Sequence, residues 1–114
     1  MRKVIMASLL AATLTTQANA ATHWCTGSVE TFYVSSNGLA IFKPAWSPVY
    51  LQICNVNEDW NGVSPNVCMA WVAKVDAAIG LSKQIRIKYD DVPACDQVPS
   101  NASSPPPVYL MLLP

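Results

Sequence analysis

The first twenty residues constrain this chain most, because they have the pattern of a secretory signal peptide. Two basic residues follow Met1, residues 4–14 form a largely apolar stretch, and residues 18–20 (Ala-Asn-Ala) match a small-x-small cleavage site. The apolar stretch is well short of the roughly 20 apolar residues that cross a bilayer. We therefore predict a signal peptide at residues 1–20 and one exported domain, periplasmic or secreted, at residues 21–114, with no membrane span.

Export changes the size and the charge of the chain that folds. The 94 residues from Ala21 onward carry five basic and seven acidic side chains, a formal charge of −2. This balance argues against nucleic acid as a partner, because such binding depends on basic surface. A chain of this length buries only about 60–65% of its unfolded surface. Its core alone is therefore thin, and we expect covalent cross-links.

All four cysteines lie in the exported part of the chain. An oxidising compartment favours pairing them, and four cysteines allow three connectivities. We favour Cys54 with Cys68, which closes a loop between neighbouring elements, and Cys25 with Cys95, which ties the start of the domain to its far end. A zinc site would need paired cysteines or histidines at short spacing. The spacing here does not provide them, so we expect no metal and no cofactor.

Three strands are predicted before a single helix. Residues 28–35 are rich in β-branched and aromatic side chains, and Asn37-Gly38 marks a tight turn into residues 39–42. These two segments should form a hairpin. Residues 49–54 are the third strand candidate, after a connection bounded by prolines.

The helix is predicted between a polar loop and a glycine. Ser64 is a suitable N-cap, Pro65 suits the first helical position, and Gly80 ends the pattern. Apolar residues recur through this segment at helical spacing: Cys68, Trp71, Val72, Val75 and Ile79. We expect these side chains to face the core.

Two further strands are predicted after the helix. Residues 84–89 alternate apolar and charged side chains, as in a strand with one buried face, and residues 108–113 follow a long connection rich in Pro, Asp and Ser. The protein is thus mostly β with one helix, in the order β-β-β-α-β-β. This order matches an OB-like five-stranded barrel, in which the helix separates the third and fourth strands. The alternative is an open α+β sheet with one packed helix.

Part of this arrangement resembles a known family. Residues 50–54 (Tyr-Leu-Gln-Ile-Cys), Cys68 at the helix start and residues 83–87 (Lys-Gln-Ile-Arg-Ile) look like the OB-fold B subunits of bacterial exotoxins, especially of the subtilase-cytotoxin and typhoid-toxin type. The resemblance covers about 40 of the 94 exported residues. It implies a homo-oligomer, a pentameric ring with the helices toward a central pore, and binding of cell-surface glycans. None of that family's sugar-binding residues is matched here.

The chain also resembles small exported proteins of Gram-negative bacteria, a group that implies no activity. The side chains themselves do not favour an enzyme. Nucleophilic catalysis needs a base beside the nucleophile, and the single histidine, His23, lies among the first exported residues, which we expect to be flexible. Two pairs of adjacent carboxylates, Glu58 with Asp59 and Asp90 with Asp91, lie in polar loops where such groups are normally solvated. We predict a non-catalytic protein.

The tryptophans give better support for binding. Trp71 belongs to the apolar face of the helix, and Trp24, beside Cys25, is expected to cover a disulfide. Trp60 differs, because amide and carboxylate side chains flank it on a loop: Asn57, Asp59 and Asn61. A sugar ring binds against a flat apolar face with hydrogen-bonding groups nearby, and loops on a rigid scaffold often carry such sites. We predict a carbohydrate site there and a second candidate at Trp46; alternatively, both rings fold back over the core.

A protein ligand is the alternative to a carbohydrate. The proline-rich segment 99–107 has the composition of a pre-ordered contact and also of an ordinary linker. The functional prediction is therefore an exported binding domain for a glycan or, alternatively, a periplasmic or secreted protein-binding domain or inhibitor.

Overall fold

The computed structural model describes residues 21–114, so the predicted signal peptide lies outside the described residues. These residues form six strands, one α-helix and one short 3-10 helix in the order β1 (Ala21–Gly27), β2 (Val29–Val34), β3 (Leu39–Pro44), β4 (Leu51–Asn55), α1 (Pro65–Gly80), β5 (Ile85–Val92), η1 (Cys95–Gln97) and β6 (Tyr109–Leu112). The prediction of a mostly β protein with one helix is confirmed. Neither helix of residues 21–114 is long and apolar enough to cross a membrane.

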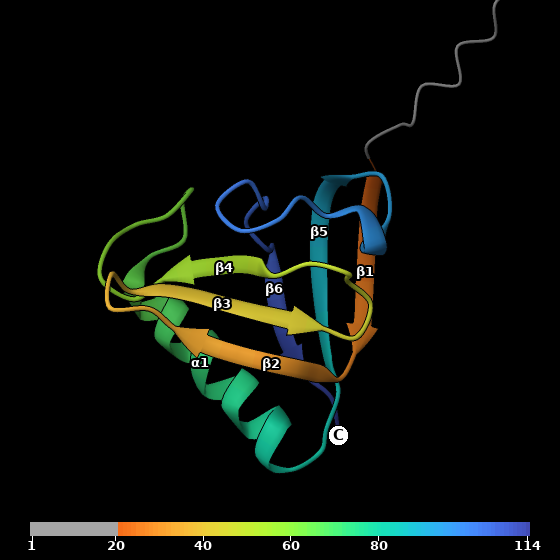
Figure 1. Ribbon diagram of the computed structural model, residues 1–114, viewed down its shortest axis with the longest axis horizontal. Coiled ribbons are helices and arrows are strands. Elements are labelled where there is room, and N and C mark those ends of the chain that lie inside the picture. The colour runs from red at the N-terminus through yellow and green to blue at the C-terminus, as the bar shows by residue number, and fades with distance from the viewer. Residues whose placement is uncertain (1–20) are drawn as a thin grey trace, which may run out of the picture.

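The strands form two small antiparallel sheets, of order β2-β3-β4 and β1-β5-β6. In Figure 1 the strands of the first sheet run across those of the second. The chain passes from β1 to β2 through Ser28 alone, whose carbonyl accepts a hydrogen bond from the Ala45 N–H at 2.9 Å. The two sheets are not closed into a barrel. They pack as two layers joined at this corner.

The predicted hairpin is confirmed as β2 and β3. Its turn contains Gly38 at φ +87°, a conformation that glycine adopts without the steric cost of a Cβ. A Cβ at this position would lie 2.6 Å from Asn55 Oδ1 and 2.7 Å from Asn57 Nδ2. The turn therefore packs tightly against the end of β4, and the Val56 N–H donates to the Gly38 carbonyl at 2.8 Å.

Strand β1 was not predicted, and the expectation of a flexible start was wrong. It pairs with β5 over most of its length, with His23 opposite Tyr89 and Cys25 opposite Ile87. Cys25 is buried while its two neighbours are exposed, which is the alternation of a half-buried strand. Only one strongly apolar side chain faces inward along this short segment, so its composition is only a weak indication of a strand. The pairing with β5 stabilises it.

Helix α1 begins and ends as predicted. The Ser64 hydroxyl accepts from the Val67 N–H at 3.3 Å, and Pro65 occupies the first turn. The helix buries Cys68, Trp71, Val75 and Ala78 and contacts β2, β4 and β6. Ile79 was expected on this face but is 45% exposed, because the buried stripe continues through Ala78 instead.

Both predicted disulfides are confirmed. Cys25–Cys95 joins β1 to η1, and Cys54–Cys68 joins β4 to α1. All four cysteines are paired, with no free thiol. Each sheet is therefore linked covalently to an element outside it.

The core between the sheets holds one unsatisfied hydroxyl. Tyr89 is fully buried on β5, and its hydroxyl has no hydrogen-bond partner within the described chain. Desolvation by burial raises the pKa of Tyr89 above its ordinary value near 10, because the charged phenolate would lose its hydration.

Candidate ligand-binding site

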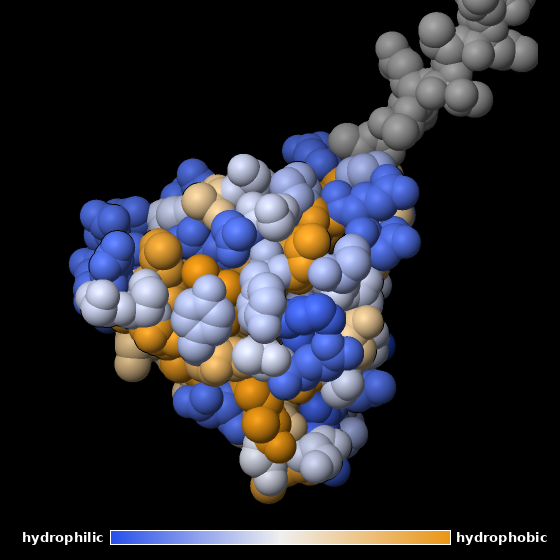
Figure 2. All heavy atoms as spheres, in the orientation of Figure 1, coloured by the Kyte–Doolittle hydropathy of each residue, from blue (hydrophilic) through white to orange (hydrophobic). Residues whose placement is uncertain are grey.

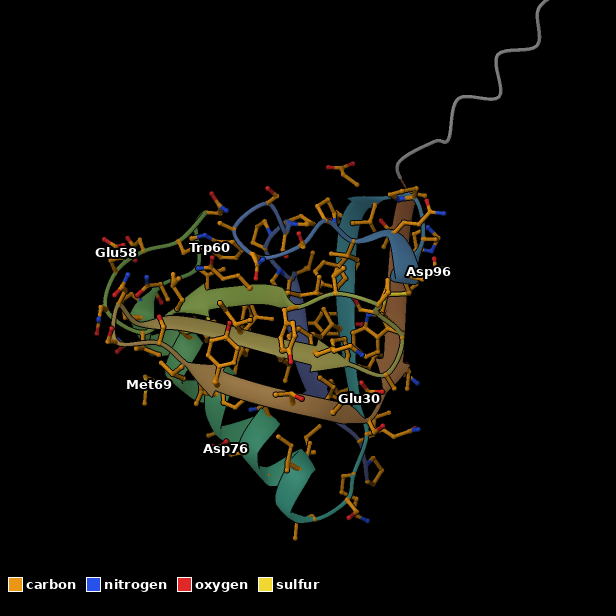
Figure 3. All side chains as sticks on the ribbon, in the orientation of Figure 1. Glu30, Glu58, Trp60, Met69, Asp76 and Asp96 are labelled. Carbon is orange, nitrogen blue, oxygen red and sulfur yellow. A yellow bond between two sulfur atoms is a disulfide. The ribbon has the colours of Figure 1, made fainter. Side chains whose placement is uncertain are left out.

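The loop between β4 and α1 is ordered around a tight turn. Trp60 and Val63 exchange two backbone hydrogen bonds, Trp60 N–H to Val63 carbonyl at 3.0 Å and Val63 N–H to Trp60 carbonyl at 2.9 Å. Between them, Asn61 and Gly62 both have positive φ, +48° and +86°. This is the two-residue turn that an Asn-Gly pair favours. Figure 3 shows Trp60 and Glu58 together on this loop, with Asp96 on the opposite side of the molecule.

The residues predicted to bind sugar do not form one cluster. Trp60 is half-buried, whereas Asn57 and Asp59 are exposed, and the Asn57 amide packs against the β2–β3 turn at Gly38. Trp46 lies elsewhere, packed edge-on against Phe42 with ring centroids 6.0 Å apart. Its indole Nε1 is buried without a partner in the described chain. Of the five residues, only Asn61 lines the pocket described next.

A pocket of about 410 Å³ opens where the loop, the start of α1, the end of β5 and the segment before β6 meet. Such a volume is within the range of small-molecule sites. Its lining residues are Asn61, Gly62, Val63, Ser64, Val67, Trp71, Asp90, Asp91, Pro105, Pro106, Pro107 and Val108. None of these residues is basic.

The polar side of the pocket depends on an irregularity at the end of β5. Asp90 and Asp91 are both exposed, between buried Tyr89 and Val92, and the register of β1 with β5 shifts at this point. Asp91 has φ +57°, so two consecutive residues project from the strand as in a β-bulge. The Asp90 carboxylate accepts a hydrogen bond from the Thr22 hydroxyl at 2.9 Å. Bulges often orient side chains at functional sites.

The apolar side of the pocket is built from valines, prolines and an edge of Trp71. Trp71 is only 8% exposed, so it offers little flat surface to a ligand. The proline segment is held in place: Asn101 forms a bridge to Leu51 of β4, and the buried Ser104 hydroxyl donates to the Pro99 carbonyl at 2.7 Å. The walls are therefore largely preformed.

Comparison of the chain with models of protein families, with curated proteins and with solved structures finds no match.

The outer face of the sheet β1-β5-β6 carries a connected set of side chains beside this pocket. Trp24 is 57% exposed, and its indole Nε1 donates to the Tyr109 hydroxyl at 2.8 Å. Lys88 Nζ lies 5.7 Å from the Trp24 ring centroid, a cation–π distance. The expectation that Trp24 covers a disulfide was wrong, because the alternation of β1 points Cys25 inward and Trp24 outward.

We call this surface the Trp24 face and define it by six residues that project from three strands: Thr22, Trp24, Thr26, Arg86, Lys88 and Tyr109. The register places Lys88 opposite both Trp24 and Tyr109, and Arg86 opposite Thr26. Arg86 Nε donates to the Thr26 hydroxyl at 3.0 Å. These hydrogen bonds hold the polar side chains of the Trp24 face in place in the absence of a ligand.

The sheet β2-β3-β4 has its own aromatic pair. Tyr33 and Tyr50 are 44% and 40% exposed, with ring centroids 6.1 Å apart. Further along this sheet, Lys43 and Glu30 form an ion pair. No residue of this pair or this ion pair lines the pocket.

The titratable residues considered for catalysis from the sequence lie at different places in residues 21–114. His23 sits on β1 opposite Tyr89, half-buried, and Asp90 and Asp91 are the carboxylates that reach the pocket. Among residues 21–114, no group of three or more His, Cys, Asp or Glu side chains is placed to hold a metal ion.

Proposed function

We propose that residues 21–114 form an exported, non-catalytic binding domain that takes a neutral carbohydrate in the pocket between α1 and the end of β5. The observation that carries this proposal is the combination in one preformed pocket of two carboxylates, an amide and a hydroxyl with apolar walls. The signal-peptide pattern and the two disulfides support export.

The chemistry of the pocket suits sugar hydroxyls. Asp91 and the free oxygen of Asp90 are strong hydrogen-bond acceptors, and the Asn61 amide can both donate and accept. The C–H faces of a sugar ring would pack against Val67 and the proline wall. An acidic sugar is disfavoured, because its carboxylate would approach two like charges without a basic side chain in the pocket lining.

An OB-like fold whose barrel is not closed is part of this proposal, and the connection between the two sheets supports it. Only Ser28 separates β1 from β2, yet the two strands belong to different sheets. The first strand of an OB barrel is long and takes part in both halves of the barrel, and β1 and β2 would correspond to its two halves. The helix precedes β5, and the bridge from Leu51 to Asn101 is parallel. We propose that the fold is an OB-type module with its closing strand pair replaced by this single bridge.

A protein ligand is the second candidate, supported by the outer side of α1. Met69 and Ile79 of α1, and Leu81 just after it, are 54%, 45% and 63% exposed, and Figure 2 shows hydrophobic atoms among polar ones on the side where this helix lies. Exposed apolar patches often mark contacts with other proteins, including copies of the same chain. The native mass of residues 21–114 distinguishes self-association from binding of a different protein. A closed ring would bury these apolar side chains between copies of the chain, whereas a monomer would leave them exposed for another partner.

The pocket is tested with two matched variants in a screen of immobilised neutral oligosaccharides. Asp91→Asn keeps a side chain that tolerates positive φ and removes the charged acceptor, so we expect about tenfold weaker binding. Asp59→Asn makes the same chemical change on the loop beside Trp60, outside the pocket, and should leave binding unchanged. The reverse pattern would move the site to the Trp60 loop that the sequence suggested, and no binding to any glycan would refute the carbohydrate proposal.

A further inference from the structure

The Trp24 face lies next to the pocket, and the proposed function gives it no role. Asp90 lines the pocket and accepts a hydrogen bond from Thr22 of β1. Two residues further along the strands come Trp24 and Lys88, and residues two apart on a strand project from the same face about 7 Å apart. The pocket and the Trp24 face therefore meet at Asp90 and its hydrogen-bond partner Thr22.

The two parts offer complementary chemistry. The pocket supplies carboxylates and an amide, but its one aromatic ring, Trp71, is almost fully buried. The Trp24 face supplies the exposed ring that the pocket lacks: Lys88 Nζ lies over one face of this ring, and the hydrogen bond to Tyr109 fixes its orientation. Aromatic rings held in place before binding lose little conformational entropy when a ligand packs on them.

We infer that the Trp24 face is a second subsite, which binds the next sugar unit of a linear neutral oligosaccharide whose terminal unit occupies the pocket. This inference rests on the proposed function of the pocket.

Charge argues for a neutral occupant rather than an acidic or a basic one. Carboxylates lie at the pocket, whereas the cation Lys88 lies beside Trp24 and the cation Arg86 lies two residues further from the pocket along β5. A uniformly charged chain that crossed the pocket and the Trp24 face would meet like charge at one of them. Lys88 is also placed over Trp24, and Arg86 is engaged by Thr26, so both cations already have partners. Sugar hydroxyls can bond to both parts without this conflict.

The test is the dependence of affinity on ligand length. Residues 21–114, in the oxidised form, are titrated calorimetrically with glucose, galactose and N-acetylglucosamine and with neutral di- and trisaccharides that end in each of them. We expect the disaccharides to bind about tenfold more tightly than the monosaccharide, since the second unit gains the Trp24 contact. Trp24→Ala should remove that gain and leave monosaccharide affinity unchanged.

Tyr33→Ala is the matched control, because it removes an exposed aromatic ring from the other sheet and should preserve the gain. If Trp24→Ala folds poorly, Tyr109→Phe serves instead: it removes the acceptor that orients Trp24, and the length-dependent gain should fall about threefold. Equal affinities for mono- and disaccharides, or a gain that survives both variants, would overturn the second subsite and leave the pocket proposal standing. No binding of any sugar would instead refute the proposed function itself.

Discussion

The two sheets of this protein have similar parts and different surfaces. Each has three antiparallel strands, one cysteine in a disulfide and one aromatic pair. On β2-β3-β4 the ring centroids of Tyr33 and Tyr50 lie 6.1 Å apart, whereas on β1-β5-β6 the Trp24 indole donates a hydrogen bond to the Tyr109 hydroxyl and Lys88 Nζ lies over the Trp24 ring. The Trp24 face also meets the pocket at Asp90, which lines the pocket and accepts a hydrogen bond from Thr22. Exposed aromatic area alone is therefore a weak indicator of a site; its connection to ordered polar groups and to a pocket distinguishes one sheet from the other.

The largest difference between the sheets should appear when each disulfide is removed. Cys25–Cys95 closes a sequence separation of 70 residues and Cys54–Cys68 one of 14. In the chain-entropy model, the double variant Cys25→Ala/Cys95→Ala should lose about 4 kcal/mol of unfolding free energy, and Cys54→Ala/Cys68→Ala about 3 kcal/mol. Urea unfolding of both variants measures this. Equal or reversed losses would show that local packing, not loop length, sets the contribution of each bridge.

A smaller effect distinguishes the inner face of β1-β5-β6. Tyr89→Phe removes a buried hydroxyl without a partner, so we expect stability at pH 7 to be unchanged or to rise by up to about 1 kcal/mol. A clear loss would mean that an ordered water satisfies this hydroxyl in solution.

The raised pKa of Tyr89 predicts that the free energy of unfolding decreases at alkaline pH. Because burial raises the pKa of Tyr89 in the folded state, the unfolded chain loses this proton first, near pH 10. The contribution is fully present below that pH, and above it stability should fall by about 1.4 kcal/mol per pH unit until the folded group also ionises. Urea unfolding between pH 9 and 11 should show a steeper fall for the natural chain than for Tyr89→Phe; parallel curves would contradict the raised pKa.

Local patterns in the sequence predicted much of the fold. The Asn37-Gly38 turn, the Ser64 cap with Pro65, and the alternation that led into β5 each depend on neighbouring residues, and each was confirmed. Strand β1 was missed because its stability comes from pairing with a segment some 60 residues away in sequence. Its alternation around Cys25 was the available signal, and it would have placed Trp24 on the outer surface.

The candidate site was harder to predict. Asp90 and Asp91 were interpreted as a solvated pair, although they follow directly on an alternating strand, which is where a bulge can redirect side chains. The pocket joins three segments that are distant in sequence, residues 61–71, 90–91 and 105–108, so neither its volume nor its walls follow from any local pattern. Of the loop residues proposed from sequence, Asn61 reaches it; the role of Trp60 stays a prediction.

The most direct test of this account is the behaviour of the four indole N–H signals in a ¹H–¹⁵N NMR titration of residues 21–114 with a neutral disaccharide that binds. Trp24 and Trp71 lie in the proposed subsites, whereas Trp46 and Trp60 do not line the pocket. The account predicts shifts of the Trp24 and Trp71 signals and little change in the other two. Shifts confined to Trp60 or Trp46 would contradict it and place the sugar outside the pocket.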